Sequence, residues 1–313
     1  MNHSLEQKIE NYRKIRKLVW NESTSGILEN QKKLREKITT VTESSNLYRS
    51  WNADPTKIWE HLWQKVRYAG IKADSATKVI NDIKPFFNDY NSLASETWNN
   101  GGELLEAYLN HSGCFASLKI NRHSFKLECT LELARKYKSH INEDKPPISF
   151  IVDDQFNSSL STQRDLIKYF TENQYTRMWK VFNTFKKGYW GKNSGVTTFH
   201  LLMDLGFPVI KPDIVISRLF YGLGWLETGP CISGDFSKYT HLENTKPIIE
   251  LAQEIVANVS TEDLENDIGW VTENPIREFD IFMVKFGQEP ETGWGLDKKL
   301  FRSNDDLKRL LHL

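Results

Sequence analysis

Apolar residues recur along most of this chain at the spacing of an α-helix. Between residues 5 and 19, and again between 27 and 41, they fall at positions that share one face of a helix, which is typical of an amphipathic helix. The first of these runs opens with Ser4-Leu5-Glu6-Gln7, the pattern of a capping box. Another predicted helix begins at Asp54-Pro55, an N-cap residue followed by a proline suited to the first helical position. The first fifty residues therefore predict a helical extension that leads into the main body.

Helical signals continue to the end of the chain and are clearest near residue 280. Asn274-Pro275 gives an N-cap and a first-turn proline, apolar residues follow at helical spacing, and Gly287 is a suitable terminator. Shorter runs predict helices over 58–66, 76–83, 162–170, 174–185, 248–257 and around Leu264, with two more over 90–111.

Between residues 115 and 152 the pattern leaves helix and strand open. The stretch SFKLECTLEL alternates as a strand does, yet LECTLELARKY also continues as a helix. ISFIVDD, which follows Pro146-Pro147, fits one short strand. The predicted fold class is mainly α, with short strands allowed in this region.

The polar linker NEDKPP at 142–147 is the best candidate for a boundary between two lobes. We expect a helical N-terminal extension over 1–50, a first helical lobe over 51–160, and a second lobe over 161–313. The polar stretch at 228–247 is too long for a plain connector. It predicts either a lid that contacts substrate or a variable surface loop.

Composition narrows the class of protein. The 313 residues are 39% apolar and 26% charged, without an uncharged apolar run long enough to span a membrane. The charged N-terminus does not resemble a secretory signal. Three cysteines, Cys114, Cys129 and Cys231, lie far apart, which predicts neither a disulfide framework nor a metal site. We expect a cytoplasmic monomer without a cofactor, a metal or a membrane partner.

Charge is neutral overall but uneven along the chain. Residues 176–218 hold seven Lys and Arg against two Asp. A neutral protein with one basic region suits selective docking on nucleic acid. A solvated, lysine-rich helix face explains the same charges equally well.

The basic region contains a glycine-bearing hairpin at 187–195, followed by a predicted helix from about Ser194 to Leu205. Glycines let the backbone approach a ligand, and the N–H groups at the start of the helix favour an anion such as a phosphodiester. Lys186, Lys187 and Lys192 add positive charge. The alternative is an ordinary helix–turn–helix connection in which the glycines serve only the turn.

Asp213 follows Pro212 at the start of a second apolar helix. An Asp in this place is a common N-cap. It also stands among apolar residues with Lys211 and Arg218 as the nearest charges, so it could stabilise a developing cation or activate water. Both interpretations of Asp213 stay open on the residues alone.

The order of these elements resembles the helix-hairpin-helix (HhH-GPD) DNA glycosylase superfamily. A spacing of twenty-two residues separates Gly191 from Asp213, close to that of the family, and PIREFDIFMVKFGQ at 275–288 resembles its closing helix. The likeness covers roughly 55–85 and 160–288 and is most specific over 186–224. The matching residues are Gly191, Leu205, Gly206, Pro208, Asp213, Ile216, Arg218, Leu223 and Gly224, with Arg277, Asp280 and Gly287 in the closing helix.

The resemblance implies a two-lobed helical glycosylase fold that acts on double-stranded DNA with a modified base. In this family an Asp in the place of Asp213 supports cleavage of the N-glycosidic bond of a flipped-out base. Phosphate binding would fall on Lys186, Lys187, Gly188, Gly191, Lys192, Asn193, Ser194 and Gly195. The base pocket or wedge would draw on the aromatic residues Tyr68, Tyr189, Trp190, Phe220 and Trp225.

The chain also departs from the family pattern. Where the branch that also nicks DNA carries a lysine, this chain has Asn193, so a monofunctional glycosylase that uses water is expected. The role would be base-excision repair or defence against modified phage DNA. One alternative is a non-catalytic helix-hairpin-helix DNA-binding protein, and another is a helical scaffold without a nucleic-acid role.

Overall fold

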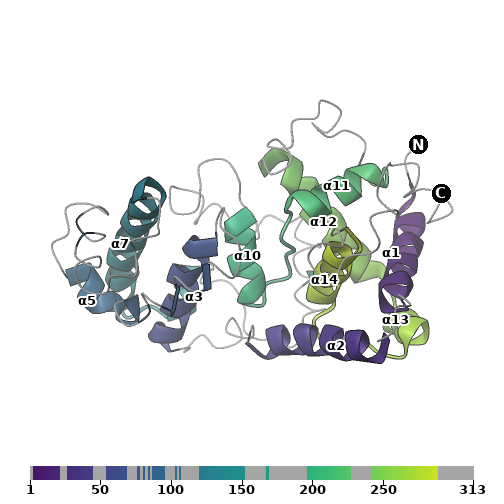
Figure 1. Cartoon of the computed structure of the whole chain (residues 1–313), viewed down its shortest axis with the longest axis horizontal. Coiled ribbons are helices and arrows are strands. Elements are labelled where there is room, and N and C mark those ends of the chain that lie inside the picture. Colours follow the sequence, from purple (N-terminus) through teal and green to yellow (C-terminus); the bar gives the residue numbers. More distant parts are fainter. Residues whose placement is uncertain are drawn as a thin grey trace. The chain divides into compact units, whose positions relative to one another are not determined.

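The computed structural model describes a helical protein in two compact units (Figure 1). The first unit comprises residues 1–46, 159–176 and 193–313, and the second comprises 47–158 and 177–192. Within the residues that the structure describes, no segment forms a strand, and no helix is long and apolar enough to cross a membrane. The described residues are 3–21, 27–44, 54–68, 76–77, 80–81, 84, 87–95, 103, 106, 120–151, 167–168, 196–226 and 242–287.

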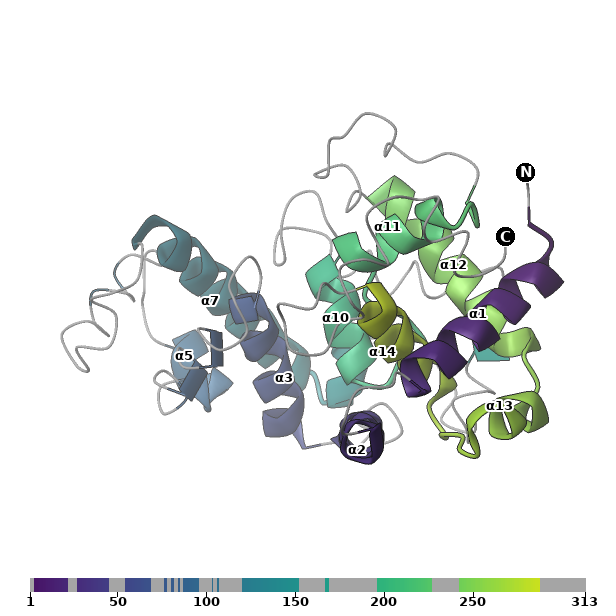
Figure 2. The same cartoon turned by 45° about the vertical axis from the view of Figure 1, so that its right-hand side comes forward.

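The first unit is organised around its last described helix, α14. This helix contacts α1, α2, α11 and α12, whose ribbons can be found in Figures 1 and 2. Nearly all of its side chains are buried. Its phenylalanines Phe279, Phe282 and Phe286 are fully buried. The helices of this unit are α1 (Leu5–Trp20), α2 (Ile27–Ser44), α10 (Val196–Asp204), α11 (Ile214–Gly222), α12 (Leu242–Asn258), α13 (Thr261–Ile268) and α14 (Pro275–Gly287).

The predicted helix starts in this unit are confirmed by their caps. Ser4 and Gln7 exchange side-chain to backbone hydrogen bonds of 2.9 and 3.2 Å, which is a complete capping box. At the start of α14, Asn274 Oδ1 accepts a 3.2 Å bond from the amide of Arg277. These side chains satisfy amide groups that have no partner within the helix.

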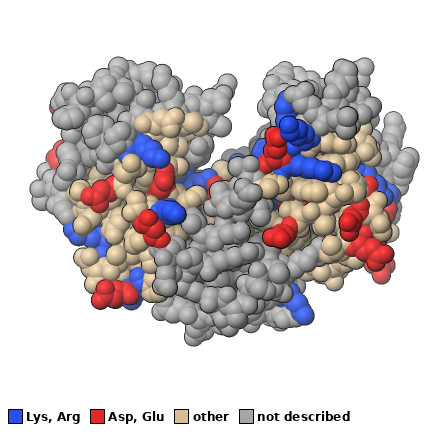
Figure 3. Space-filling model, turned by 90° about the horizontal axis from the view of Figure 1, so that it is seen from below, with Lys and Arg blue, Asp and Glu red and all other residues tan. Residues whose placement is uncertain are grey.

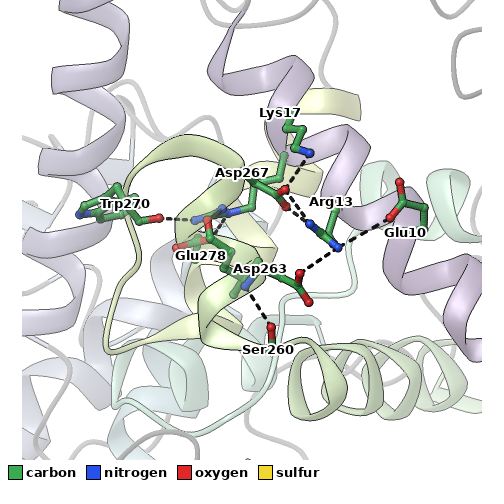
Figure 4. A network of polar contacts seen from close by, with 10 residues as sticks. Glu10, Arg13, Lys17, Ser260, Asp263, Asp267, Trp270 and Glu278 are labelled. Carbon is green, nitrogen blue, oxygen red and sulfur yellow. Dashed lines mark hydrogen bonds and ion pairs between the residues drawn. The ribbon is translucent and has the colours of Figure 1, made fainter.

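α1 is built into the core of the first unit. Tyr12 and Ile15 are buried, and the ring of Tyr12 lies 4.6 Å from that of Phe279. The fully buried Arg16 pairs with Glu278 and donates to the carbonyls of Leu264 and Trp270. One turn earlier, Arg13 makes two 2.8 Å bonds to Asp267, which also receives Lys17 at 2.7 Å, in the network of Figure 4.

The second unit packs around aromatic side chains. Its elements are α3 (Pro55–Tyr68), α5 (Tyr90–Ser95), α7 (Ile120–Asn142) and the 3-10 helix η2 (Pro147–Phe150). Tyr137 of α7 lies against Trp59, Tyr90 and Phe150, with ring centroids 4.9–6.0 Å apart, and its hydroxyl donates to the carbonyl of Pro55 at 2.8 Å. Asp54 caps α3 as predicted, accepting a 2.8 Å bond from the amide of Thr56.

The strands allowed within 115–152 are wrong for the described part of that region. Residues 120–142 form one continuous helix, and 147–150 form a 3-10 helix. Leu131, Ala134 and Tyr137 are buried at helical spacing, so packing on α3 and α5 decides a segment whose local pattern fits both structures. The linker 142–147 is a turn between α7 and η2, which contact each other within one unit.

The polar stretch at 228–247 is shorter as a loop than the sequence predicts. Its last six residues form the first part of α12, which begins at Leu242 and includes Pro247. Proline lacks an amide donor, so it is expected to mark a helix start. Here Pro247 lies in the second turn of α12, so the helix lacks one backbone hydrogen bond near its N-terminus. Residues 227–241 lie outside the described residues.

Candidate functional site

The candidate site begins at the turn that ends α10. The amide of Phe207 donates to the carbonyl of Leu202 at 2.9 Å, and the amide of Gly206 donates to Met203 at 3.1 Å. Gly206 has φ 92°, a left-handed conformation that residues with a Cβ rarely adopt. This pair of bonds is a Schellman motif, which ends the helix and turns the chain toward α11.

The connector from α10 to α11 is held inside the protein. Phe207, Val209 and Ile210 are at most 3% exposed, and the buried amide of Gln253 on α12 donates to the carbonyl of Pro208. A connector that is packed and hydrogen-bonded in this way presents the next residues in a defined position. Those residues are Lys211, Pro212 and Asp213.

Asp213 is the N-cap of α11. Its Oδ1 accepts hydrogen bonds of 2.9 Å from the amide of Val215 and 3.3 Å from the amide of Ile216. Its Oδ2 lies 3.4 Å from Nζ of Lys211, and the side chain is 22% exposed. One carboxylate oxygen therefore caps the helix, while the other lies beside the ammonium of Lys211.

The far end of α11 repeats the turn at Gly206. The amide of Trp225 donates to the carbonyl of Phe220 at 3.0 Å, and Gly224 has φ 69°. Both glycines belong to the motif that resembles the glycosylase family. Here their physical role is to end two successive helices, so that α10 and α11 flank the connector that carries Asp213.

A buried ion pair on α14 is hydrogen-bonded to the backbone of this connector. Asp280 Oδ2 lies 3.3 Å from Nη1 of Arg277, and its Oδ1 accepts a 3.1 Å bond from the amide of Lys211. Burial raises the pKa of Asp280, and the negative charge of Asp213 adds to this; Arg277 and Lys211 oppose it. Arg277 and Asp280 are thus a positioning pair for the residues around Asp213.

Lys37 on α2 belongs to the same group of charges. Its pKa is lowered by burial and by the positive charges of Arg277 and Lys211, while Asp280 opposes the shift. Sequence reasoning missed Lys37 because it is one of three lysines on an amphipathic helix. The available signal was its place beside Ile38, on the edge of the apolar stripe.

The predicted site residues differ in what the structure says of them. The phosphate-binding residues Lys186, Lys187, Gly188, Gly191, Lys192, Asn193, Ser194 and Gly195 and the aromatic residues Tyr189 and Trp190 lie outside the described residues. Tyr68 is the last residue of α3, and its side chain is not among those described.

Trp225 and Phe220 are core residues, which corrects their assignment to a base pocket or wedge. Trp225 is 1% exposed, Phe220 is fully buried, and their rings meet edge to face at 5.1 Å. A stacking surface needs an exposed ring face. The apolar side chains pack inward because α11 buries this side of its C-terminal turn.

No family model, curated protein or solved structure matches the chain. In the described part of the chain, no group of three His, Cys, Asp or Glu side chains is placed to hold a metal ion. On the face in Figure 3, the coloured Lys and Arg side chains lie interspersed with Asp and Glu. The local arrangement around Asp213 is therefore the feature of this unit with a candidate chemical role.

Proposed function

We propose that this protein is a DNA glycosylase that hydrolyses the N-glycosidic bond of a modified base and leaves an abasic site. Asp213 is the catalytic carboxylate. The observation that carries the proposal is that the two oxygens of this partly exposed carboxylate have different partners. Oδ1 accepts hydrogen bonds from two amides of α11, and Oδ2 lies 3.4 Å from Nζ of Lys211. A charge that is fixed before substrate arrives stabilises a transition state without reorganisation.

The chemistry explains why a fixed carboxylate is useful. As the bond from C1′ to the base nitrogen breaks, its electron pair leaves with the base and positive charge grows on the sugar. Water then adds to C1′ and loses a proton, which balances the electron pair that left with the base. A nearby carboxylate lowers the energy of the cationic sugar, as in other glycosidic cleavage. The base must first leave the stack to be reached.

Two further features support the proposal. Gly206 and Gly224 adopt left-handed conformations at the two turns of the motif that resembles the family. Asp280 and Arg277, also part of that resemblance, hold the backbone two residues before Asp213. The absence of a lysine at Asn193 favours water over a lysine nucleophile.

The test uses DNA duplexes that carry alkylated, deaminated, oxidised or hypermodified bases. Abasic sites are scored by alkaline cleavage for the wild type and for Asp213→Asn. Because Asn is nearly as good an N-cap, this variant should fold and bind DNA normally. We expect its excision rate to fall about a hundredfold or more. Undiminished base release by the variant would refute the role of Asp213.

A second candidate is a DNA-binding protein without catalytic activity. It is favoured by the fact that capping of α11 and the ion pair with Lys211 fully account for Asp213 as a structural residue. This alternative predicts salt-sensitive DNA binding and no abasic sites on any duplex. It also predicts that Asp213→Asn binds DNA as the wild type does.

The base that is removed separates the two biological roles. Excision of deaminated, alkylated or oxidised bases would indicate repair. Excision confined to hypermodified bases would indicate defence against modified phage DNA. The same set of duplexes decides between them.

A further inference from the structure

Helix α2 is firmly attached to the body of the first unit. Leu34 and Ile38 are buried against Ile281 and Phe282 of α14 and against Trp20. The amide side chain of Gln31 donates a 3.0 Å bond to the carbonyl of Trp20. In addition, the guanidinium of Arg35 lies over the stacked rings of Trp20 and Trp270, at 5.0 and 5.7 Å.

Lys37 lies on α2 next to the residues that pack against α14. It is one turn after Leu34 and adjacent to Ile38, so it lies at the edge of the face that meets α14. On α14, Arg277 lies one turn before Ile281 and Asp280 immediately precedes it, at the same contact. Lys37 as a residue is exposed to solvent. Partial burial of its ammonium lowers its pKa, the positive charges of Arg277 and Lys211 lower it further, and Asp280 opposes the shift.

The charges at this place do not balance. Arg277 is paired with Asp280, and Lys211 is paired with Asp213. Among the described residues, no carboxylate lies within ion-pair distance of Lys37. Three cations therefore face two carboxylates, and the surplus positive charge is on an exposed lysine whose neighbours repel it. A bound anion would relieve that repulsion.

We propose that Lys37 and Lys211 form a second phosphate-binding site, for a backbone phosphate of the DNA strand that presents its base to Asp213. The proposal rests on DNA being the substrate, as argued above. A carboxylate that must approach a polyanionic strand needs cations beside it, because its own charge repels the phosphates. Ammonium groups bind phosphate as point charges without strict geometry.

The site makes α2 part of the DNA-binding surface. This role differs from that of the glycine hairpin, because α2 lies in the N-terminal segment, outside the region that resembles the glycosylase family. It also gives a reason for the attachment of α2 through Leu34, Ile38 and Arg35. A phosphate contact on a rigid helix fixes the register of the strand at Asp213.

The test compares Lys37→Ala and Lys37→Glu with the matched control Lys32→Ala. Lys32 lies on the same helix, five residues away and on a different face; it is 76% exposed and 3.8 Å from Glu36. Binding of a short fluorescein-labelled duplex is measured by anisotropy over a range of salt concentrations, and base release is measured separately.

We expect Lys37→Ala to weaken binding about three- to tenfold and to reduce the slope of log affinity against log salt by about 1. Lys37→Glu should weaken binding further, and Lys32→Ala should leave the slope unchanged. Equal slopes for Lys37→Ala and Lys32→Ala overturn this inference, even if the wild type releases a base. Conversely, a wild type that binds DNA but releases no base refutes the glycosylase alone, and the difference between the variants still supports the phosphate site.

Discussion

The backbone amide of Lys211 donates a 3.1 Å hydrogen bond to Oδ1 of Asp280, a residue 69 positions later in the chain. Through this bond a carboxylate buried in α14 holds the backbone two residues before Asp213. Because Asp280 also pairs with Arg277 at 3.3 Å, the same carboxylate balances a buried guanidinium. Site geometry and core stability are therefore coupled in one side chain.

The first prediction concerns that coupling. The side chain of Asp280→Asn can still accept a hydrogen bond from the amide of Lys211. The variant leaves the buried guanidinium of Arg277 without a countercharge. We expect a loss of about 3–5 kcal/mol in the free energy of unfolding, measured by urea denaturation. Adding Arg277→Met should restore much of the loss, since it removes the unpaired charge. An Asp280→Asn variant as stable as the wild type would contradict the pairing.

The close contact of α14 with α11 gives the second prediction. A Cβ added to Gly287 would lie 2.6 Å from Cγ1 of Val215 and 2.8 Å from Cδ1 of Leu219, so these side chains or α11 itself must shift. We expect Gly287→Ala to cost about 1–3 kcal/mol of stability and to reduce base release, because the first turn of α11 orients Asp213.

Two further variants check this explanation. Val215→Ala should remove the closer of the two clashes and leave the one with Leu219, so the double variant should be more stable than the two single losses predict. Gly269→Ala is the control: Gly269 has φ 68° and nothing within 4 Å, so it tests the cost of backbone conformation without a clash. Additive losses at Gly287 and Val215 would show that the two do not collide.

The third prediction is a dependence of stability on pH. Burial opposes ionisation of Asp267, but hydrogen bonds from Arg13 and Lys17 outweigh it and lower its pKa. With the folded pKa below the unfolded one, the carboxylate adds stability above the unfolded pKa and loses it as pH falls through the folded pKa.

Asp267→Asn should therefore be less stable at neutral pH by about 2 kcal/mol. The difference from the wild type should shrink as the pH falls below about 4. Thermal unfolding of both proteins over a series of pH values measures the gap. A gap that stays constant into acid would mean that the charge of Asp267 contributes nothing.

The fourth prediction concerns the fully buried Arg16. Arg16→Met leaves Glu278 unpaired and two carbonyls without a donor, so we expect a loss of about 3–5 kcal/mol. Arg16→Lys keeps the charge but not the planar fork that reaches three acceptors, and should also destabilise. A double variant with Glu278→Met should recover only part, since the carbonyls of Leu264 and Trp270 stay without a partner. Full recovery of the free energy of unfolding would show that the hydrogen bonds from Arg16 to these two carbonyls do not contribute to stability.

Features written in adjacent residues could be predicted from the sequence. The caps at Ser4, Asp54 and Asn274 and the helix ends at Gly206 and Gly224 follow from local hydrogen bonding and from the conformational freedom of glycine. Asp213 was identified for the same reason, since an N-cap is visible in the sequence.

Features that depend on distant partners could not be predicted. Lys37 and Arg16 look like ordinary helix lysines and arginines until tertiary packing brings them to Arg277 and Glu278. The helix over 120–142 was ambiguous because its alternating stretch fits two periods, and neighbours in space decide between them. Trp225 was misassigned because an aromatic residue after a turn can be core or surface.

Arg16 pairs with Glu278 across 262 residues of sequence, so the ribosome makes the two partners at very different times. At the usual rate of elongation, α1 leaves the ribosome roughly 13–50 s before α14 exists to receive it. During that interval Tyr12 and Ile15 have no native surface to cover them, and Arg16 stays hydrated. The first unit can close only when nearly all of its chain has been made. Interrupted translation therefore yields a fragment in which the apolar face of α1 is uncovered, a form that chaperones and proteases recognise.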